Sequence, residues 1–266
     1  MFAVIFEVQP KPERWDDYLS LAKELKPKLE AIDGFIENER FASKRTTGRL
    51  LSLSIWRDEK AVIRWRTHGE HHGAQEKGRF EIFADYHLRV GEITADSQPP
   101  KGVPVDEQRF DATEVGEAKT VTITVVTPDE GGATAAKPDL LPTHLGLRRG
   151  AAGLVDHEVF ESIYNPGKLV LLASWRDADA AAAWRPAAKP VHHRQVRIIR
   201  DYGMFERREA PQFYPDVKCA ADARRRRANA PSGSGRLAAP SDSGRSRMSA
   251  SLRNRPSLAR EQMVDK

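Results

Sequence analysis

The 266-residue sequence predicts an α+β protein made of two tandem βαββαβ modules and a basic C-terminal tail. The first observation is an internal repeat: "LLSLSIWRDEKAVIRWR" at 50–66 returns as "LVLLASWRDADAAAAWR" at 169–185, an offset of 119. Between Gly34 and Arg66, 13 of 33 positions are identical to their counterparts. A period of this length indicates a duplicated small domain, because it is too long for a solenoid unit. The second observation is the order of strand and helix patterns in each copy, and the third is a polar, basic composition after Val217.

The first copy opens with a mostly apolar strand at 2–8 and continues, after two prolines, into an amphipathic helix. Apolar residues recur along this helix at the i, i+3, i+4, i+7 spacing of one buried stripe. They are Trp15, Tyr18, Leu19, Ala22, Leu25, Leu29 and Ile32. Asp33-Gly34 is a turn signal that ends the helix.

A hairpin and a second helix follow. The alternating segment 35–41 and the apolar segment 49–56 flank the turn "SKRTTG" and are expected to pair as antiparallel strands. Asp58 is a typical N-cap for a helix that carries Trp65. A looser helical stretch, "GEHHGAQEKGR", precedes a closing strand at 80–93. The order βαββαβ is that of a ferredoxin-like module, in which helices cover one face of a four-stranded sheet.

These patterns predict four parts. Residues 1–93 form the first module, 94–118 a linker, 119–217 a second and degenerate module, and 218–266 the tail. The linker is polar, contains three prolines and has no periodicity. The tail combines many Arg, Ser, Ala, Gly and Pro residues with almost no aromatic residues, so it cannot bury enough apolar area to fold and is expected to be disordered.

Prolines weaken both helices of the second module. Pro138 and Pro142 leave too little room for a four-turn first helix, and Pro186 interrupts the second. At the ends of the module, we align the opening strand "FAVIFEV" with "VTITVVT" from Val121. We align Asp201-Tyr202 in the closing strand with Asp85-Tyr86.

Charge and composition bound the partners. The net charge is +5, but residues 218–266 carry twelve Lys and Arg against four Asp and Glu, so the rest of the chain is net negative. The run Arg224–Arg227 lacks interleaved aromatics, which does not favour a nucleic-acid partner. No apolar run reaches the ~20 residues of a membrane span, and the single Cys219 supports no disulfide. We expect a cytoplasmic protein without a membrane partner.

The motif series resembles a known family. "GF…E…F" on a strand, "W-R-D-E-x-A…W-R" across a strand end and helix, "H…H…AQ…GR" and a closing "DY…V" strand are similar to the antibiotic biosynthesis monooxygenase family. The resemblance covers 1–93 well and 119–209 more faintly. It implies the dimeric α/β-barrel architecture, in which two sheets pack on each other and so cover their apolar faces. Because both modules lie on one chain, we expect an intrachain pseudo-dimer, and two chains can still associate into a further homo-oligomer.

Histidines and one tryptophan are the first candidates for chemistry. His68, His71 and His72 form a dense group, and histidine can abstract a proton near neutral pH. We predict His71 and His72 as catalytic bases and His68 as a substrate contact; a solvated helix end remains the alternative. Trp65 is predicted to line a substrate pocket, and its alternative is simple core packing. No acidic residue lies at matching spacing, so no metal site is predicted.

Asn38, Arg40 and Tyr86 complete the predicted substrate-binding set, since all three are polar residues on strands that could face a pocket. An ordinary surface or structural role is the alternative for each. The resemblance also includes haem-degrading members, whose axial histidine falls on Gln75 here and whose first-strand asparagine is missing from "FAVIFEV". Both differences argue against haem.

The resulting hypothesis is a cofactor-independent monooxygenase that acts on a small aromatic or quinol substrate. A base would form the substrate anion, and the anion would itself reduce oxygen in a pocket that excludes water. Two alternatives stay open. One is a non-catalytic ligand-binding or structural protein with the same fold, and the other is haem binding or degradation.

Overall fold

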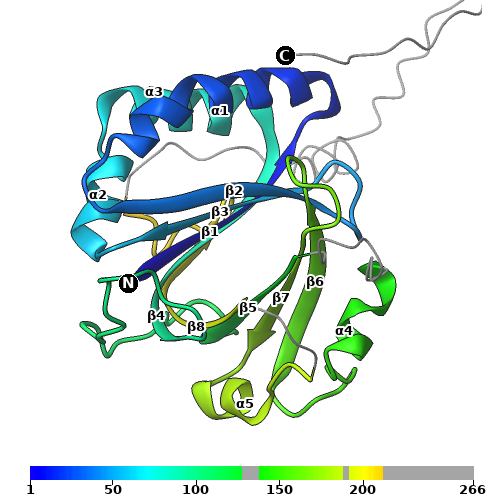
Figure 1. Cartoon of the computed structure of the whole chain (residues 1–266). Coiled ribbons are helices and arrows are strands. Elements are labelled where there is room, and N and C mark those ends of the chain that lie inside the picture. Colours follow the sequence, from blue (N-terminus) through cyan, green and yellow to red (C-terminus); the bar gives the residue numbers. More distant parts are fainter. Residues whose placement is uncertain (128–137, 188–191, 212–266) are drawn as a thin grey trace, which may run out of the picture. The chain divides into compact units, whose positions relative to one another are not determined.

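Eight antiparallel strands form one closed barrel in the computed structural model, which describes residues 1–127, 138–187 and 192–211 (Figure 1). Around the barrel the order is β1-β3-β2-β6-β7-β5-β8-β4. The strands are β1 (Phe2–Pro10), β2 (Phe35–Ser43), β3 (Leu50–Trp56), β4 (Phe83–Asp96), β5 (Thr120–Val126), β6 (Leu154–Ser162), β7 (Leu169–Trp175) and β8 (His192–Gly203).

Each predicted module contributes one half of this barrel. Strands β1–β4 and β5–β8 form two four-stranded sheets, which join through the β2–β6 and β4–β8 pairs. The prediction of two ferredoxin-like modules paired within one chain is therefore confirmed. Alternate residues of every strand point inward and build a common core. It contains Ala3, Ile5, Phe41, Leu53, Ile93, Val121, Ile123, Phe160, Leu172 and Ile198.

The helices lie on the outside of the barrel (Figure 1). Those of the first module are η1 (Pro12–Arg14), α1 (Trp15–Glu30), α2 (Glu59–Arg66), α3 (Gly69–Lys77) and the π-helical turn η2 (Gly78–Ile82). Those of the second are η3 (Pro138–Leu140), α4 (Leu141–His144) and α5 (Ala178–Ala183). Asp58 caps α2 through the backbone N–H of Ala61, as predicted, and Asp177 caps α5 in the same way. The short α4 and α5 agree with the predicted effect of the prolines.

The closing strand of the first module begins later than predicted. The helical turn η2 occupies residues 78–82, so β4 starts at Phe83 rather than at Phe80 and runs on to Asp96. Ile82 is fully buried under α1, together with Tyr18. Ile82 is apolar because it packs against α1, and not because it is part of a strand.

The predicted alignment of the two opening strands is wrong by one residue. Phe2 pairs with Trp56, and Thr120 pairs with the counterpart Trp175, so the offset in this strand is 118 and not 119. A slip of one residue exchanges the two faces of a strand. With the observed offset Val121 and Ile123 face the core as Ala3 and Ile5 do, while threonines replace the outward residues of β1.

The predicted alignment of the closing strands is also wrong. Phe2 pairs with Glu92 and its counterpart Thr120 pairs with Arg197, which gives an offset of 105. Tyr202 is therefore not the counterpart of Tyr86. The second module is 14 residues shorter at this place, and α3 and η2 together span the 14 residues from Gly69 to Ile82. In the second module α5 ends at Ala183 and β8 already begins at His192.

The predicted linker is irregular beyond Asp96 but folds onto the barrel. Val103 and Val105 pack against the barrel core. The fully buried carboxylate of Glu92 accepts the backbone N–H groups of Gln108 (2.6 Å) and Arg109 (2.9 Å). The predicted disorder of the tail at 218–266 lies outside the described residues. Among the helices that are described, none has the length and apolar character needed to span a membrane.

Candidate active site

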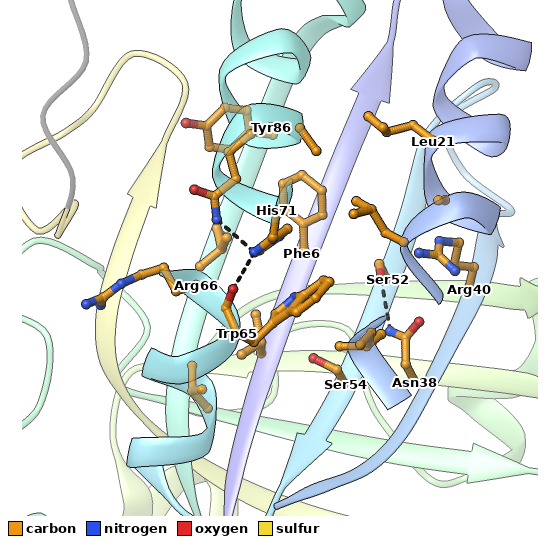
Figure 2. A pocket seen from close by; sticks show the side chains of 18 of the residues that line it. Phe6, Leu21, Asn38, Arg40, Ser52, Ser54, Trp65, Arg66, His71 and Tyr86 are labelled. Atoms are coloured by element: carbon orange, nitrogen blue, oxygen red, sulfur yellow. Dashed lines mark hydrogen bonds between the residues drawn. The ribbon is translucent and has the colours of Figure 1, made fainter. Parts of the chain in front are cut away.

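A cavity of about 200 Å³ lies between the sheet of the first module and the helices that cover it (Figure 2). Its floor comes from β1, β3, β2 and β4, and its walls come from α1, α2 and α3. Six of its apolar side chains are Val4, Phe6, Leu21, Leu25, Leu88 and Val90. The predicted apolar stripe of α1 supplies one wall, and the outward-facing residues of β1 supply part of the floor because strand side chains alternate between faces.

Trp65 and His71 form the wall on the side of α2 and α3. Their rings stack with centroids 4.1 Å apart and planes 15° apart. His71 Nδ1 lies 2.9 Å from the carbonyl oxygen of Trp65. A carbonyl oxygen only accepts, so Nδ1 carries the hydrogen and donates it. In the neutral ring the lone pair is then on Nε2, for which no partner is found among the described residues.

The environment keeps the His71 ring neutral. Burial disfavours the charged ring and lowers the pKa of His71 to about 4, although the hydrogen bond to Trp65 acts in the opposite direction. Gln75 Nε2 also lies 3.3 Å from this Nδ1, but two N–H groups cannot bond to each other, so with this tautomer the contact is not a hydrogen bond. At neutral pH the cavity therefore contains an uncharged imidazole with a free lone pair, which is the form that accepts a proton.

Polar groups gather on the opposite side, on β2 and β3 (Figure 2). Asn38 donates through Nδ2 to Ser52 Oγ (3.1 Å) and to the carbonyl oxygen of Leu53 (3.0 Å). Arg40 lies beside the hydroxyl of Tyr18, whose pKa is raised by burial and lowered in part by the charge of Arg40. The Nε of Arg40 is buried and has no hydrogen-bond partner in the part of the chain that the structure describes.

Two tyrosines border the cavity near β4. The hydroxyl of Tyr86 accepts hydrogen bonds from Arg207 Nη1 (2.6 Å) and Arg79 Nη1 (3.3 Å). Tyr202 is buried, and this burial raises its pKa to about 12. Tyr202 comes from β8 of the second module, where it pairs with Leu88 across the β4–β8 junction. The cavity of the first module is thus completed by the second.

Five of the seven predicted site residues line this cavity: Asn38, Arg40, Trp65, His71 and Tyr86. The other two lie outside its lining. His72 is exposed on α3, and His68 lies at the start of that helix with its ring centroid 5.9 Å from that of Trp65.

Tyr202, Ser52 and Arg66 also line the cavity and were not predicted from the sequence. Ser52 could have been found from strand alternation, since it lies opposite Arg40 in the β2–β3 ladder. Tyr202 could not, because it was assigned to the wrong strand position.

The equivalent region of the second module is filled by side chains. Trp184, the counterpart of Trp65, is 8% exposed and stacks on Trp175 with ring centroids 5.9 Å apart. Leu141 and Leu145 pack against the same cluster and are fully buried. The rival hypothesis of a non-catalytic protein predicts blocked pockets in both modules. Only the second module meets that description.

Comparison with known proteins points to one family. The family model described as antibiotic biosynthesis monooxygenase matches residues 1–77 and again 121–194. A protein of Pyricularia oryzae named jasmonate monooxygenase ABM is 46% identical over 222 residues, which cover 81% of this chain and 99% of that protein. The uncharacterized protein YqjZ of Bacillus subtilis is 32% identical over 92 residues, or 35% of this chain and 78% of that protein.

Similar solved structures include the aldoxime dehydratase OxdRE in complex with butyraldoxime. That structure is 11% identical, has a TM-score of 0.48 and covers 74% of this chain and 79% of its own. At this identity and TM-score the similarity says nothing about the function of this protein.

Proposed function

The chain belongs to the antibiotic biosynthesis monooxygenase family, and on that premise we propose that it oxygenates a small, largely apolar molecule in the cavity of the first module. The observation that supports this most directly is the neutral His71. Its ring faces a cavity with mostly apolar walls, and its Nδ1 is held by the carbonyl of Trp65. The neutral ring has its lone pair available, and the substrate anion formed beside it would raise its low pKa during proton transfer, because a neighbouring negative charge favours the imidazolium.

For an electron-rich aromatic or quinol the reaction balances with oxygen as the only co-reactant. Nε2 of His71 takes a proton from a hydroquinone, and the resulting anion transfers one electron to O₂. The two radicals combine into a carbon–oxygen bond, and the hydroperoxide loses water to give a hydroxyquinone. One hydroquinone and one O₂ yield one hydroxyquinone and one water, with the proton on His71 returned to the departing hydroxide. The apolar walls formed by Phe6, Leu21 and Trp65 limit competing reactions with water.

The relative of Pyricularia oryzae favours a second candidate substrate, because its name refers to jasmonate and the identity extends over nearly its whole length. Jasmonates are small cyclic ketones with a carboxylate side chain, and their size and apolar body fit a cavity of this type. Hydroxylation of a saturated carbon takes two further electrons from a reductant. Jasmonate is therefore tested with and without an added reductant.

The test is oxygen uptake by the full chain with a panel of hydroquinones and with jasmonate. His71→Ala is expected to lower kcat by about 10²- to 10⁴-fold, the usual contribution of a positioned base. The matched control is His72→Ala, which removes a neighbouring exposed histidine outside the cavity lining and is expected to leave the rate within about twofold. Unchanged uptake in His71→Ala would reject the role of His71. Ligand binding without uptake by the unmodified protein would instead favour the non-catalytic alternative.

A further inference from the structure

The described lining of the cavity contains three positively charged side chains and no carboxylate. The positive side chains are those of Lys26, Arg40 and Arg66. Lys26 lies 3.8 Å from Glu30, an ion pair along α1. Arg40 forms no ion pair with any described residue. An otherwise apolar cavity with this charge balance is suited to an anionic ligand.

Two other arginines, buried in the barrel, are paired with carboxylates, whereas the buried Arg79 donates to the carbonyl oxygen of Met204. In the barrel, Arg89 binds Glu7 at 2.6 Å and Arg194 binds Asp96 at 2.8 Å. A buried guanidinium without such a partner costs folding free energy, because it loses its hydration shell. Arg40 is half-buried. Among the described residues, the neutral Tyr18 hydroxyl is the partner found for its guanidinium, and its buried Nε has none.

The neighbouring glutamate cannot fill this role. Adjacent residues of a strand point to opposite faces, so Glu39 lies on the other side of the sheet from Arg40. There its carboxylate is already bound by Lys168 (2.5 Å) and Ser162 (2.6 Å) of the second module. The position for an anion beside Arg40 is therefore left to a ligand.

A second donor lies next to Arg40. Ser52 is its direct partner in the β2–β3 ladder, which places both side chains on the cavity face within about 5.5 Å of each other. Ser52 Oγ accepts a hydrogen bond from Asn38 (3.1 Å), and its own hydroxyl hydrogen has no acceptor among the described residues. A guanidinium and a hydroxyl side by side are suited to the two oxygens of one carboxylate.

The second module serves as an internal control. At the same offset of 119, Arg40 corresponds to Val159 and Ser52 to Leu171, which also face each other across a ladder. Both are buried in the filled core of that module. The polar pair is thus present in the module with the cavity and replaced by apolar residues in the module whose equivalent region is filled.

We propose that Arg40 and Ser52 bind the carboxylate of a small amphipathic acid, whose apolar body extends across the cavity toward Trp65 and His71. This names the substrate class of the same cavity and so rests on the proposed function. In this arrangement the acid end lies beside Arg40 and Ser52, and the carbon to be oxidised lies toward Trp65 and His71. Figure 2 shows these two pairs of side chains on different sides of the cavity. Neutral esters of the same molecules lack the charge that Arg40 requires.

The test compares three acids, jasmonate, indole-3-acetate and octanoate, with their methyl esters, by calorimetric titration of the full chain. At least one acid is expected to bind 10- to 100-fold more tightly than its ester, the factor typical of a hydrogen-bonded charge. Arg40→Met is expected to remove this preference while ester binding stays within threefold. Ser52→Ala is expected to weaken acid binding about threefold to tenfold and to leave ester binding unchanged.

Lys26→Met is the matched control, because it removes an equal charge from the same cavity and leaves Arg40 in place. It is expected to keep the preference for the acid. The inference is overturned if no acid binds at millimolar concentration, if acid and ester bind equally to the unmodified protein, or if Lys26→Met and not Arg40→Met removes the preference. Arg40→Met places an apolar residue where the second module has Val159, and circular dichroism verifies that it folds; Ser52→Ala provides an independent test.

The same data separate this inference from the proposed function. Selective binding of acids without oxygen uptake would support the anion site and reject the oxygenase. Oxidation of neutral quinols with equal binding of acids and esters would support the oxygenase and reject the anion site.

Discussion

Trp65 and Trp184 are counterparts in sequence, but the protein uses them differently. Helix α2 extends through Trp65 to Arg66, so the Trp65 ring stays on the helix surface beside His71. Helix α5 ends at Ala183, which leaves Trp184 extended, with its ring turned onto Trp175. Pro186 contributes to the difference, because a proline disfavours helical geometry in the residue before it, here Arg185, and so keeps α5 from continuing as α2 does. Of these two equivalent tryptophans, Trp65 therefore lines the cavity and Trp184 packs in the core of the second module.

His71 gives a prediction at the same scale. Its pKa is lowered to about 4, below the ordinary 6.5, so the ring is a neutral base throughout the neutral range. We expect kcat to be independent of this group above about pH 5.5 and to fall as the pH decreases through about 4. A rate limb centred near pH 6.5, measured from initial oxygen uptake between pH 4 and 9, would contradict this.

The same shift affects stability. Because the folded pKa is depressed, the unfolded chain takes up a proton near pH 6.5 and the folded chain only near 4. The unfolded state therefore binds more protons in that window, and the free energy of unfolding decreases as the pH falls through it. Urea titrations at several pH values measure this slope, and His71→Gln is expected to reduce it.

Residue type and spacing were sufficient to predict five cavity residues, because strand alternation and helix periodicity decide which side chains share a face. They were not sufficient for His68 and His72. His72 follows His71 on α3, and a rotation of about 100° per residue turns it out of the cavity. His68 precedes α3 as its N-cap, so helix periodicity does not determine its position. Tyr202 depends on the pairing of two distant strands, which no local pattern contains.

At the scale of elements, the β4–β8 pair decides how the modules meet. The ladder shifts register between Val90 and Gly91. A Cβ on Gly91 would lie 2.6 Å from Val196 Cγ1 and would also contact the carbonyl oxygen of Arg197. The absence of a side chain at Gly91 is therefore a condition for this close approach.

Two glycine substitutions test this difference. Gly91→Ala is expected to lower the free energy of unfolding by about 2–3 kcal/mol, since neighbouring backbone would have to move. Gly73→Ala, in α3, meets no atom within 4 Å and is expected to raise it by about 0.5–1 kcal/mol through better helix propensity. Equal changes in the free energy of unfolding, measured by chemical denaturation, would show that the room available for a Cβ atom does not distinguish Gly91 from Gly73.

The element order was predictable because each strand and helix carries its own pattern, such as the Asp58 cap and the stripe on α1. The ends of the modules were not. A single residue shifts the opening strand, and 14 residues are missing before the closing one, so one constant offset could not align the whole repeat. The turn η2 was missed because its apolar residues also fit the start of a strand.

For the whole molecule, the repeat predicted that both modules would fold together. The barrel core combines residues of both halves, among them Phe41 and Phe160 at equivalent positions. Ion pairs cross the junctions as well, for example Lys44 with Glu161 at 2.8 Å and Lys168 with Glu39 at 2.5 Å. Neither half closes its sheet or covers its apolar face alone.

We therefore expect one cooperative unfolding transition for residues 1–211, with a Tm that does not depend on protein concentration. The linked halves meet at a high effective concentration, so dilution cannot separate them. Calorimetry over a hundredfold concentration range measures this. Residues 1–118 alone are expected to self-associate or to unfold at low concentration, as light scattering can show. Two separate transitions in the linked chain would contradict the shared core.

The joining of both halves on one chain also has a genetic consequence. In a homodimer one gene encodes both subunits, so a substitution that fills the pocket of one subunit fills both pockets. Such a substitution abolishes the activity and is removed by selection. Here Val159 and Leu171 can replace Arg40 and Ser52 in one half without touching the other. The second half is then free to accumulate changes that improve support for the first, such as an extended β8 that contributes Tyr202. Two equivalent modules on one chain can therefore diverge, so that one module contains the site and the other supports it.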